Sequence, residues 1–187
     1  MESVLTTPAG WVLLPWTDDD VAALRGALAP EDAERQLGGV LVGDAAAAQW
    51  IDARQRDWAD DFGYSWAAHS PGGELAGSVT VSAIDRQHDT GWVSYWTSES
   101  FRGRGVATEA TTRMAAWALA GLCLFRLELG HRMNNPASCA VATAAGFRVE
   151  GRQRAKLRYG DRRFDVELHA RLAIDLPAGG PATDAPR

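Results

Sequence analysis

The stretch "FRGRGVATEA", residues 101–110, places two arginines and two glycines in four consecutive positions before the chain turns apolar. In a strand–loop–helix arrangement, backbone N–H groups and the positive end of the helix converge on an anion. Gly103 and Gly105 would leave room for a phosphate, and Arg102 and Arg104 would add charged donors. The Walker and G-x-G-x-x-G patterns are absent. Alone, the stretch indicates a phosphate-binding loop and a charged surface turn about equally.

Length and composition indicate one domain. The chain has 187 residues and is 46% hydrophobic, which suffices for one sizeable core. We expect a single domain over residues 1–175 and a disordered, low-complexity tail over 176–187. No run of eighteen apolar residues occurs, and no basic segment precedes the short apolar stretch near the start. We therefore expect no membrane span and no signal peptide, and a cytoplasmic location.

Two further features of the composition concern ligands. Residues 1–70 hold twelve acidic residues against four arginines, a balance of −8, and residues 71–187 hold twelve acids against fifteen basic residues, a balance of +3. The first half could attract a cationic ligand and the second an anionic one, although acidic surface also simply maintains solubility. Cys123 and Cys139 have no partners at metal-ligand spacing, so we expect two buried small hydrophobes and no metal.

Periodicity and capping signals predict the elements. Thr17 or Asp18 would cap the first helix, and Gly146 would end the last one. The predicted order is β-α-α-β-β-β-α-β-α-β-β, a mixed, mostly antiparallel α/β sheet with helices on its faces. Ranges are assigned to nine of these eleven elements: a strand and helix in 12–28, a helix in 44–62, strands in 74–84 and 90–97, a helix in 106–121, a strand in 124–131, a helix in 134–147 and a strand in 163–172.

The order of motifs between residues 76 and 172 resembles a known family. "Arg-x-x-Gly-x-Ala" at Arg102, Gly105 and Ala107 follows "GWVSYWTSES" and precedes "LFRLELGHRMNNPASCAVATAAGF". Together these resemble the GNAT superfamily of acyl-CoA-dependent N-acyltransferases, in its RimJ/RimL-like branch. The chain has Leu14 where branch members typically carry an arginine, and Trp92 where they often carry a glutamate.

The resemblance implies a GNAT fold, in which two neighbouring parallel strands splay into a V that admits the pantetheine arm of acetyl-CoA. Here these would be the strands in 90–97 and 124–131. Backbone groups of Trp96 and Thr97 would pair with the pantetheine amides and polarise the thioester carbonyl. Asn135 would bind the cofactor arm, and Ser138 would lie near the sulfur. The pyrophosphate would be held by Arg102, Gly103, Arg104, Gly105, Val106, Ala107 and Thr108.

The implied activity is transfer of an acetyl group from acetyl-CoA to a primary amine, by direct attack on the thioester. The acceptor would be a protein N-terminus or a small molecule such as an antibiotic or an amino sugar. Branch members are often dimers, so the resemblance also implies a homodimer.

Amide formation needs a neutral amine, a stabilised oxyanion and a proton for the departing thiolate. Relatives sometimes supply a glutamate on the strand after "GF", where this chain offers only Glu150. We take His131 as the candidate base, although a histidine that caps a strand end is an equal alternative. Ser138 is the candidate acid, or else a helix-start residue that bonds backbone. Tyr95 could also protonate the thiolate, or could belong to the core.

Other interpretations remain open at this point. A silent domain that binds acyl-CoA as a sensor would lack the usual base. A nucleic-acid-binding module would use the seven basic residues between Arg148 and Arg163, but no known binding motif accompanies them. Trp50, Trp58 and Trp66 could form an apolar wall for the acceptor, or could pack into the core.

Overall fold

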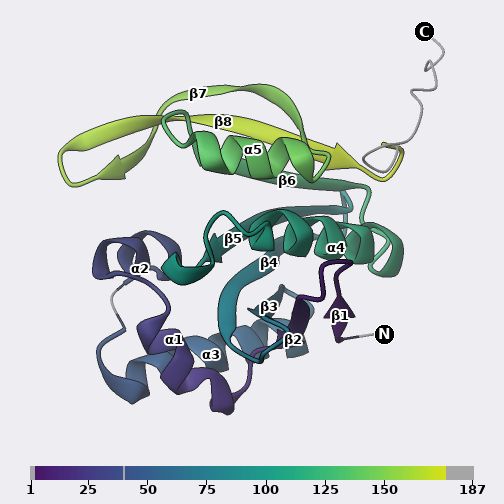
Figure 1. Ribbon diagram of the computed structural model, residues 1–187. Helices are drawn as coiled ribbons and strands as arrows, with labels where there is room; N and C mark the ends of the chain where they lie inside the picture. The colour runs from purple at the N-terminus through teal and green to yellow at the C-terminus, as the bar shows by residue number, and fades with distance from the viewer. Residues whose placement is uncertain (1–2, 40, 176–187) are drawn as a thin grey trace, which may run out of the picture.

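The computed structural model describes residues 3–39 and 41–175, which form one eight-stranded sheet in the order β1-β2-β3-β4-β5-β6-β8-β7 (Figure 1). Among the strand pairs of these described residues, only β5 with β6 is parallel. The strands are β1 (Leu5–Thr6), β2 (Val12–Pro15), β3 (Tyr64–His69), β4 (Leu75–Asp85), β5 (Thr90–Thr97), β6 (Arg126–Arg132), β7 (Arg148–Tyr159) and β8 (Arg162–Leu172). The helices are α1 (Val21–Gly26), α2 (Pro30–Leu37), α3 (Gly43–Ala59), α4 (Val106–Gly121) and α5 (Pro136–Ala144), with 3-10 turns at Asp18–Asp20 and Glu99–Phe101.

The parallel pair separates after three residues. Thr90, Gly91 and Trp92 of β5 pair with residues 126–128 of β6, and neither strand pairs with the other beyond that point. By contrast, β6 pairs with β8 along its whole length, from Arg126 to Arg132. The second halves of β5 and β6 therefore diverge and form the V that the family resemblance implies.

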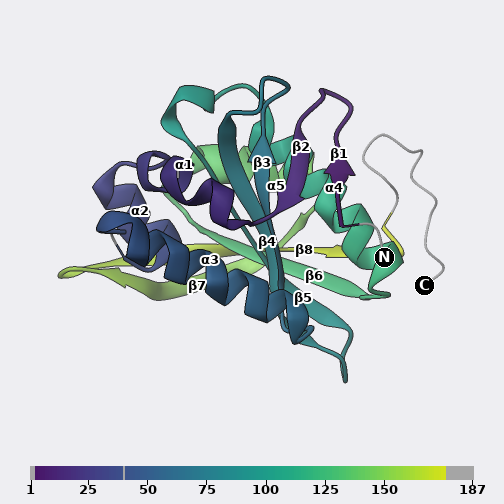
Figure 2. The ribbon, with the colours of Figure 1, turned by 90° about the horizontal axis from the view of Figure 1, so that it is seen from below.

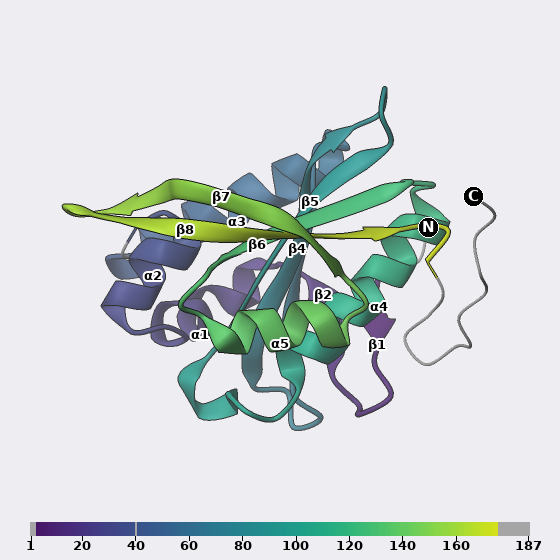
Figure 3. The ribbon, with the colours of Figure 1, turned by 90° about the horizontal axis from the view of Figure 1, so that it is seen from above.

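Helices cover both faces of the sheet. Figure 2 shows α1 and α3 on one face, and α4 and α5 lie on the other, where Figure 3 shows α5. Residues spaced by four along α4 form its buried face, because such residues share one side of a helix. They are Val106, Ala110, Met114 and Ala118, each at most 2% exposed. On the opposite face, a second core cluster lies beneath α1 to α3 and includes Leu24, Ala47, Ile51 and Trp96.

The start of α1 is anchored to the sheet by one carboxylate. Asp20 accepts hydrogen bonds from the Thr17 backbone N–H at 2.9 Å and from the Thr17 hydroxyl at 3.1 Å. Its second oxygen lies 3.1 Å from Nε2 of His69 at the end of β3. Thr17 is the cap of this turn, and it is one of the two residues, Thr17 and Asp18, that the sequence offered.

The predicted order of elements and the mixed, mostly antiparallel fold are confirmed, and the structure adds β1 and α2. The segment "PEDAERQL" of α2 is short and mostly polar, and it buries only Ala33 and Leu37, which lie four residues apart on one face. Gly146 has φ +83° after α5, as predicted for a residue that ends a helix. The expected extent of the domain, 1–175, stays a prediction, and residues 176–187 lie outside the described residues. No helix in the described part of the chain is long and apolar enough to cross a membrane.

Candidate active site

A cavity of about 770 Å³ lies in the V. Its walls come from β5, β6, the N-terminal ends of α4 and α5, helix α2, and the turn-proximal part of β7. In Figures 1 and 3, α2 and the β7–β8 turn lie at the same end of the molecule. Every residue that the sequence analysis assigned to the site lines this cavity except Arg104. Those residues are thus brought together, and their individual roles stay predictions.

The start of α4 forms an open cradle. Gly103 has φ +73° and Gly105 has φ +80°, in the left-handed region that glycine tolerates best. A Cβ added at either position would meet no atom within 4 Å. The first backbone N–H groups of an α-helix have no partner inside the helix, and residues 106–108 of α4 line the cavity. This space and these donors fit a phosphate group.

The two arginines of the cradle have partners within the protein. Nη2 of Arg102 lies 2.6 Å from Oδ2 of Asp32 on α2. Hydrogen bonds from Arg102, and then from Arg35, lower the pKa of Asp32. The guanidinium of Arg104 stacks over Phe101, with its central carbon 5.1 Å from the ring centre. Sequence reasoning missed Asp32 and Arg35, because α2 was not predicted.

The start of α5 presents one hydroxyl to the cavity. Oδ1 of Asn135 accepts from the Ser138 backbone N–H at 3.2 Å, and Nδ2 of Asn135 donates to Oγ of Ser138 at 2.9 Å. The Tyr95 hydroxyl donates to the backbone oxygen of Ser138 at 3.0 Å. Burial raises the pKa of Tyr95. Because Oγ of Ser138 already accepts from Asn135, its own proton is available to another acceptor.

The backbone of β5 alternates between its two neighbours. A Cβ added at Gly77 of β4 would come within 2.4 Å of the Trp96 carbonyl oxygen, so that oxygen faces β4. Since successive residues of a strand direct their backbone groups to opposite edges, those of Tyr95 and Thr97 face the V. Thr97, which the sequence analysis assigned to the cofactor arm, faces the V, whereas the backbone of Trp96, assigned with it, faces β4.

His131 lines the cavity, but both nitrogens of its ring have close partners. Nδ1 lies 3.0 Å from the backbone oxygen of Arg132. Nε2 lies 2.9 Å from Nε2 of His169 and 3.4 Å from Oε1 of Glu167. The side chain is 6% exposed. We predicted that His131 takes a proton from the amine. In this arrangement both of its ring nitrogens already have partners, so neither is vacant for that role.

A second, smaller cavity of about 160 Å³ shares Ser94, Tyr95 and Trp96 with the first. Trp50 and Arg54 of α3 line it, and the Arg54 guanidinium lies 4.3 Å above the Trp50 ring. Burial lowers the pKa of Arg54. The three tryptophans that could have formed a wall for the acceptor lie in different environments. Trp50 lines a cavity, Trp66 is fully buried, and Trp58 packs against the core.

Part of the positive charge of strand β7 is paired with neighbouring acids. Arg152 forms an ion pair with Asp165, and Arg148 lies 3.3 Å from Asp175. These pairs reduce the positive charge available to nucleic acid.

The expectation that both cysteines are buried is wrong. Cys123 is exposed, and Cys139 is half-buried beside Glu167 and His169. The period-2 pattern of β8 places Glu167 and His169 on one face, and this pattern is the sequence signal that could have shown that they lie together. The residues they contact, His131 and Cys139, belong to β6 and α5 and are far away in sequence.

A mixed sheet whose parallel strands splay around a cavity, with two helices starting at its walls, is the GNAT type of α/β fold. The model of the acetyltransferase (GNAT) domain matches residues 11–148. The chain belongs to this family.

Similar proteins agree with this assignment. The ribosomal-protein-serine acetyltransferase of Escherichia coli (strain K12) is 30% identical over 99 residues, which are 53% of this chain and 55% of that protein. The chain spans about half the length of the curated relatives it matches.

Two solved structures share the fold. RimL, described as a ribosomal L7/L12 α-N-protein acetyltransferase in complex with coenzyme A, has a TM-score of 0.82 at 20% identity, covering 90% of this chain and 97% of RimL. RimJ of Mycobacterium smegmatis, in complex with a CoA disulfide, has a TM-score of 0.81 at 22% identity, covering 94% and 89%.

Proposed function

We propose that this protein transfers the acetyl group of acetyl-CoA to the α-amine of a protein N-terminus. The observation that carries the proposal is the cavity in the V, which joins the open cradle of Gly103 and Gly105 to the hydroxyl of Ser138. Acetyl-CoA would supply the acetyl group as an activated thioester. The N–H groups of residues 106–108 would bind its pyrophosphate, and the backbone of Tyr95 and Thr97 would bind its arm.

Ser138 is the proposed acid. As the amine nitrogen bonds to the thioester carbon, the carbon–sulfur bond breaks and the thiolate needs a proton. The Ser138 hydroxyl can donate it, since Asn135 holds its oxygen from the other side. Water then returns a proton to the serine. Tyr95 is a positioning residue in this scheme, because its hydroxyl holds the Ser138 carbonyl.

The choice of an α-amine follows from the position of His131, the candidate base, both of whose ring nitrogens already have close partners. An α-amino group has a pKa of about 7.7–8.0, so roughly one molecule in ten is neutral at pH 7, whereas a lysine of pKa about 10.4 is neutral in fewer than about one in a thousand. An α-amine therefore needs no strong base, and solvent can accept its second proton. The proposal assigns no proton transfer to His131. The names of the Escherichia coli relative and of RimL support a protein acceptor.

The acceptor would approach through the second cavity. It adjoins the first at Tyr95 and Trp96, and its lining also includes Trp50, Arg54 and Asp57. Arg54 and Asp57, 3.8 Å apart, offer one charge of each sign to a peptide.

The test is thiol release from acetyl-CoA with three acceptors: a peptide with a free α-amine and no lysine, the same peptide with a blocked α-amine and one lysine, and an amino sugar. We expect turnover with the first alone. Turnover with only the amino sugar would show that the acceptor is a small-molecule amine and not a protein N-terminus. CoA binding without turnover would indicate a sensor. Absence of CoA binding would refute the proposal. A homodimer and a cytoplasmic location remain predictions.

A further inference from the structure

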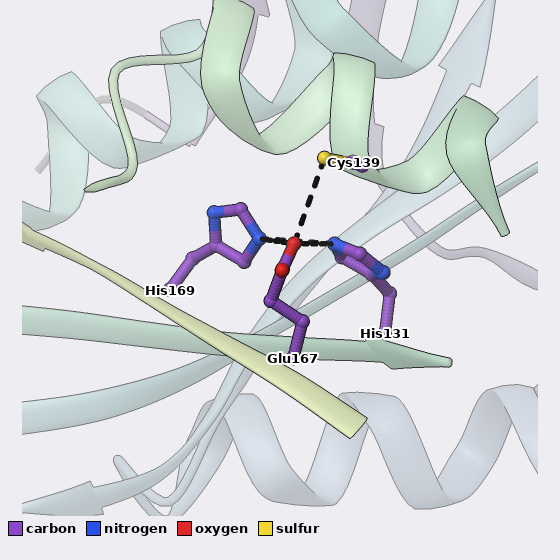
Figure 4. A group of neighbouring side chains, drawn as sticks. All are labelled: His131, Cys139, Glu167 and His169. Atoms are coloured by element: carbon purple, nitrogen blue, oxygen red, sulfur yellow. Dashed lines mark hydrogen bonds and ion pairs between the residues drawn. The ribbon is translucent and has the colours of Figure 1, made fainter. Parts of the chain in front are cut away.

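Four side chains that can bind a metal meet between the sheet and α5 (Figure 4). His131 of β6 lies opposite Glu167 of β8 in the strand register, and His169 follows two residues later on the same face. Cys139 reaches them from α5. Three separate elements therefore contribute to one group, which we call the His-Cys-Glu cluster: His131, Cys139, Glu167 and His169.

The distances within the cluster suit a single ion. Nε2 of His169 lies 2.9 Å from Nε2 of His131 and 3.1 Å from Oε1 of Glu167. Sγ of Cys139 lies 3.6 Å from the same carboxylate oxygen, and all four ligand atoms lie within 4.8 Å of one another. Tetrahedral zinc, with bonds of about 2.0–2.3 Å, separates its ligand atoms by about 3.3–3.7 Å. Small side-chain shifts would complete that geometry.

The hydrogen bonds of the two histidines direct lone pairs into the cluster. Nδ1 of His131 lies 3.0 Å from the Arg132 carbonyl oxygen, and Nδ1 of His169 lies 3.4 Å from that of Phe147. A carbonyl only accepts, so each of these hydrogen bonds assigns a proton to Nδ1, and Nε2 is the ring nitrogen that each histidine turns toward the cluster.

Two such nitrogens and a carboxylate oxygen then face one another in a buried place. The side chain of His131 is 6% exposed and that of His169 is 0% exposed. Converging lone pairs out of water are unfavourable unless a cation lies between them. The cation is either a proton on one imidazole or a metal ion.

We propose that the cluster binds one zinc-like divalent ion through Nε2 of His131, Nε2 of His169, the Glu167 carboxylate and the Cys139 thiolate. Nitrogen and sulfur ligands favour zinc over magnesium or calcium, and four protein ligands make a closed, structural site. The thiol of Cys139 loses its proton to solvent on binding. Acetyl transfer itself needs no metal.

The consequence of the ion concerns α5. Cys139 directly follows Ser138, so a bond from Cys139 to the ion would tie the first turn of α5 to β6 and β8. The hydroxyl of Ser138 and the amide of Asn135 would then be held against the V by a metal link as well as by the Tyr95 hydrogen bond.

The test uses the full chain, reduced and stripped of metal, and measures uptake of Zn²⁺ by competition with a coloured chelator. Loading with Co²⁺ gives a second readout, because tetrahedral cobalt absorbs strongly in the visible and a thiolate ligand adds a charge-transfer band. We expect one equivalent of Zn²⁺ at submicromolar affinity, and both cobalt signals. Wild-type protein that binds no Zn²⁺ at micromolar concentrations would overturn the proposal and leave a proton in the cluster.

Variants locate the ion. Cys139→Ser should lose the cobalt charge-transfer band and at least about tenfold in zinc affinity, and His169→Gln should lose more. Cys123→Ser, at the exposed cysteine, is the matched control and should bind as wild type does. Should His169→Gln fail to fold by circular dichroism, Cys139→Ser decides alone, since its site is half-buried. Unchanged binding in Cys139→Ser would place the ion elsewhere and overturn the assignment. Because no acetyl-CoA is present, these results are independent of the proposed activity.

Discussion

At Ser138, three hydrogen bonds join one residue to a helix cap and to a strand. Its backbone N–H and hydroxyl oxygen bind Asn135, and its carbonyl binds the Tyr95 hydroxyl. Ser138→Ala keeps the backbone contacts and removes the proposed proton donor. We expect kcat to fall about 100-fold, which is typical for loss of a general acid, with the KM for acetyl-CoA nearly unchanged. Steady-state thiol release measures both constants.

Tyr95→Phe is the comparison for this prediction. It removes one hydrogen bond, which costs about 1 kcal/mol of stability, and we expect kcat to fall less than tenfold. A loss in Tyr95→Phe as large as in Ser138→Ala would transfer the acid role to the tyrosine.

Two substitutions at Gly105 distinguish the effect of backbone strain on stability from the effect of charge on CoA binding. Gly105→Glu and Gly105→Ala both place a Cβ at φ +80° and should each lose about 1 kcal/mol of stability. Only the glutamate brings a carboxylate to the proposed pyrophosphate site, so only Gly105→Glu should abolish CoA binding by calorimetry. Gly73→Glu, at φ +84° with no atom near the added Cβ, is the matched control outside the cavity. Normal CoA binding by Gly105→Glu would refute the site.

Local sequence patterns predicted those residues of the candidate site that lie within single turns. Gly103 and Gly105 stand out by their spacing, which alone fits a phosphate-binding loop and a surface turn about equally. Asn135 and Ser138 were predicted through the family resemblance. The His-Cys-Glu cluster could not be found in this way, because its members meet only after β6, β8 and α5 pack together. Arg102 shows the same limit, since its partner Asp32 belongs to an element that the sequence did not predict.

At the scale of elements, the start of α1 depends on Asp20. Burial tends to raise its pKa, but hydrogen bonds from His69 and Thr17 outweigh this effect and lower it below the ordinary value of 3.8. A carboxyl with a lowered folded pKa stabilises the fold above its unfolded pKa, and this contribution disappears as pH falls through the folded value.

Asp20→Asn should therefore cost about 1–2 kcal/mol near pH 7. The difference from wild type should shrink as the pH is lowered below about 4. Urea unfolding of both proteins at several pH values measures this difference in stability. Asp19→Asn, at an exposed position of the same turn, is the control for loss of one charge. A difference that grows toward acid pH would contradict the assignment.

The elements themselves were predicted from short-range periodicity, and the exceptions have physical reasons. Helix α2 has eight mostly polar residues and buries only two of them, and β1 has two residues in all, so each offers few apolar positions from which an element could be predicted. Strand β8 alternates as expected, yet His169 and Arg171 on its polar face are also buried, because α5 covers that side. Burial of this kind depends on a neighbouring element and not on the strand's own sequence.

For the whole molecule, ligand binding should raise the melting temperature. CoA at about 100 times its Kd adds about 2.7 kcal/mol to the folded state. In a chain of this length that corresponds to a rise of about 5–10 °C. Differential scanning fluorimetry measures the shift, and Gly105→Glu should show none. An equal shift in both proteins would place CoA outside the cavity.

The most direct test of the account is mass spectrometry of a peptide that carries one free α-amine and one lysine, after reaction with acetyl-CoA at pH 7. The account predicts one acetyl group, located by fragmentation on the α-amine, with one thiol released per acetyl transferred. Acetylation on the lysine, or none on the peptide while protein and acetyl-CoA remain intact, would contradict it.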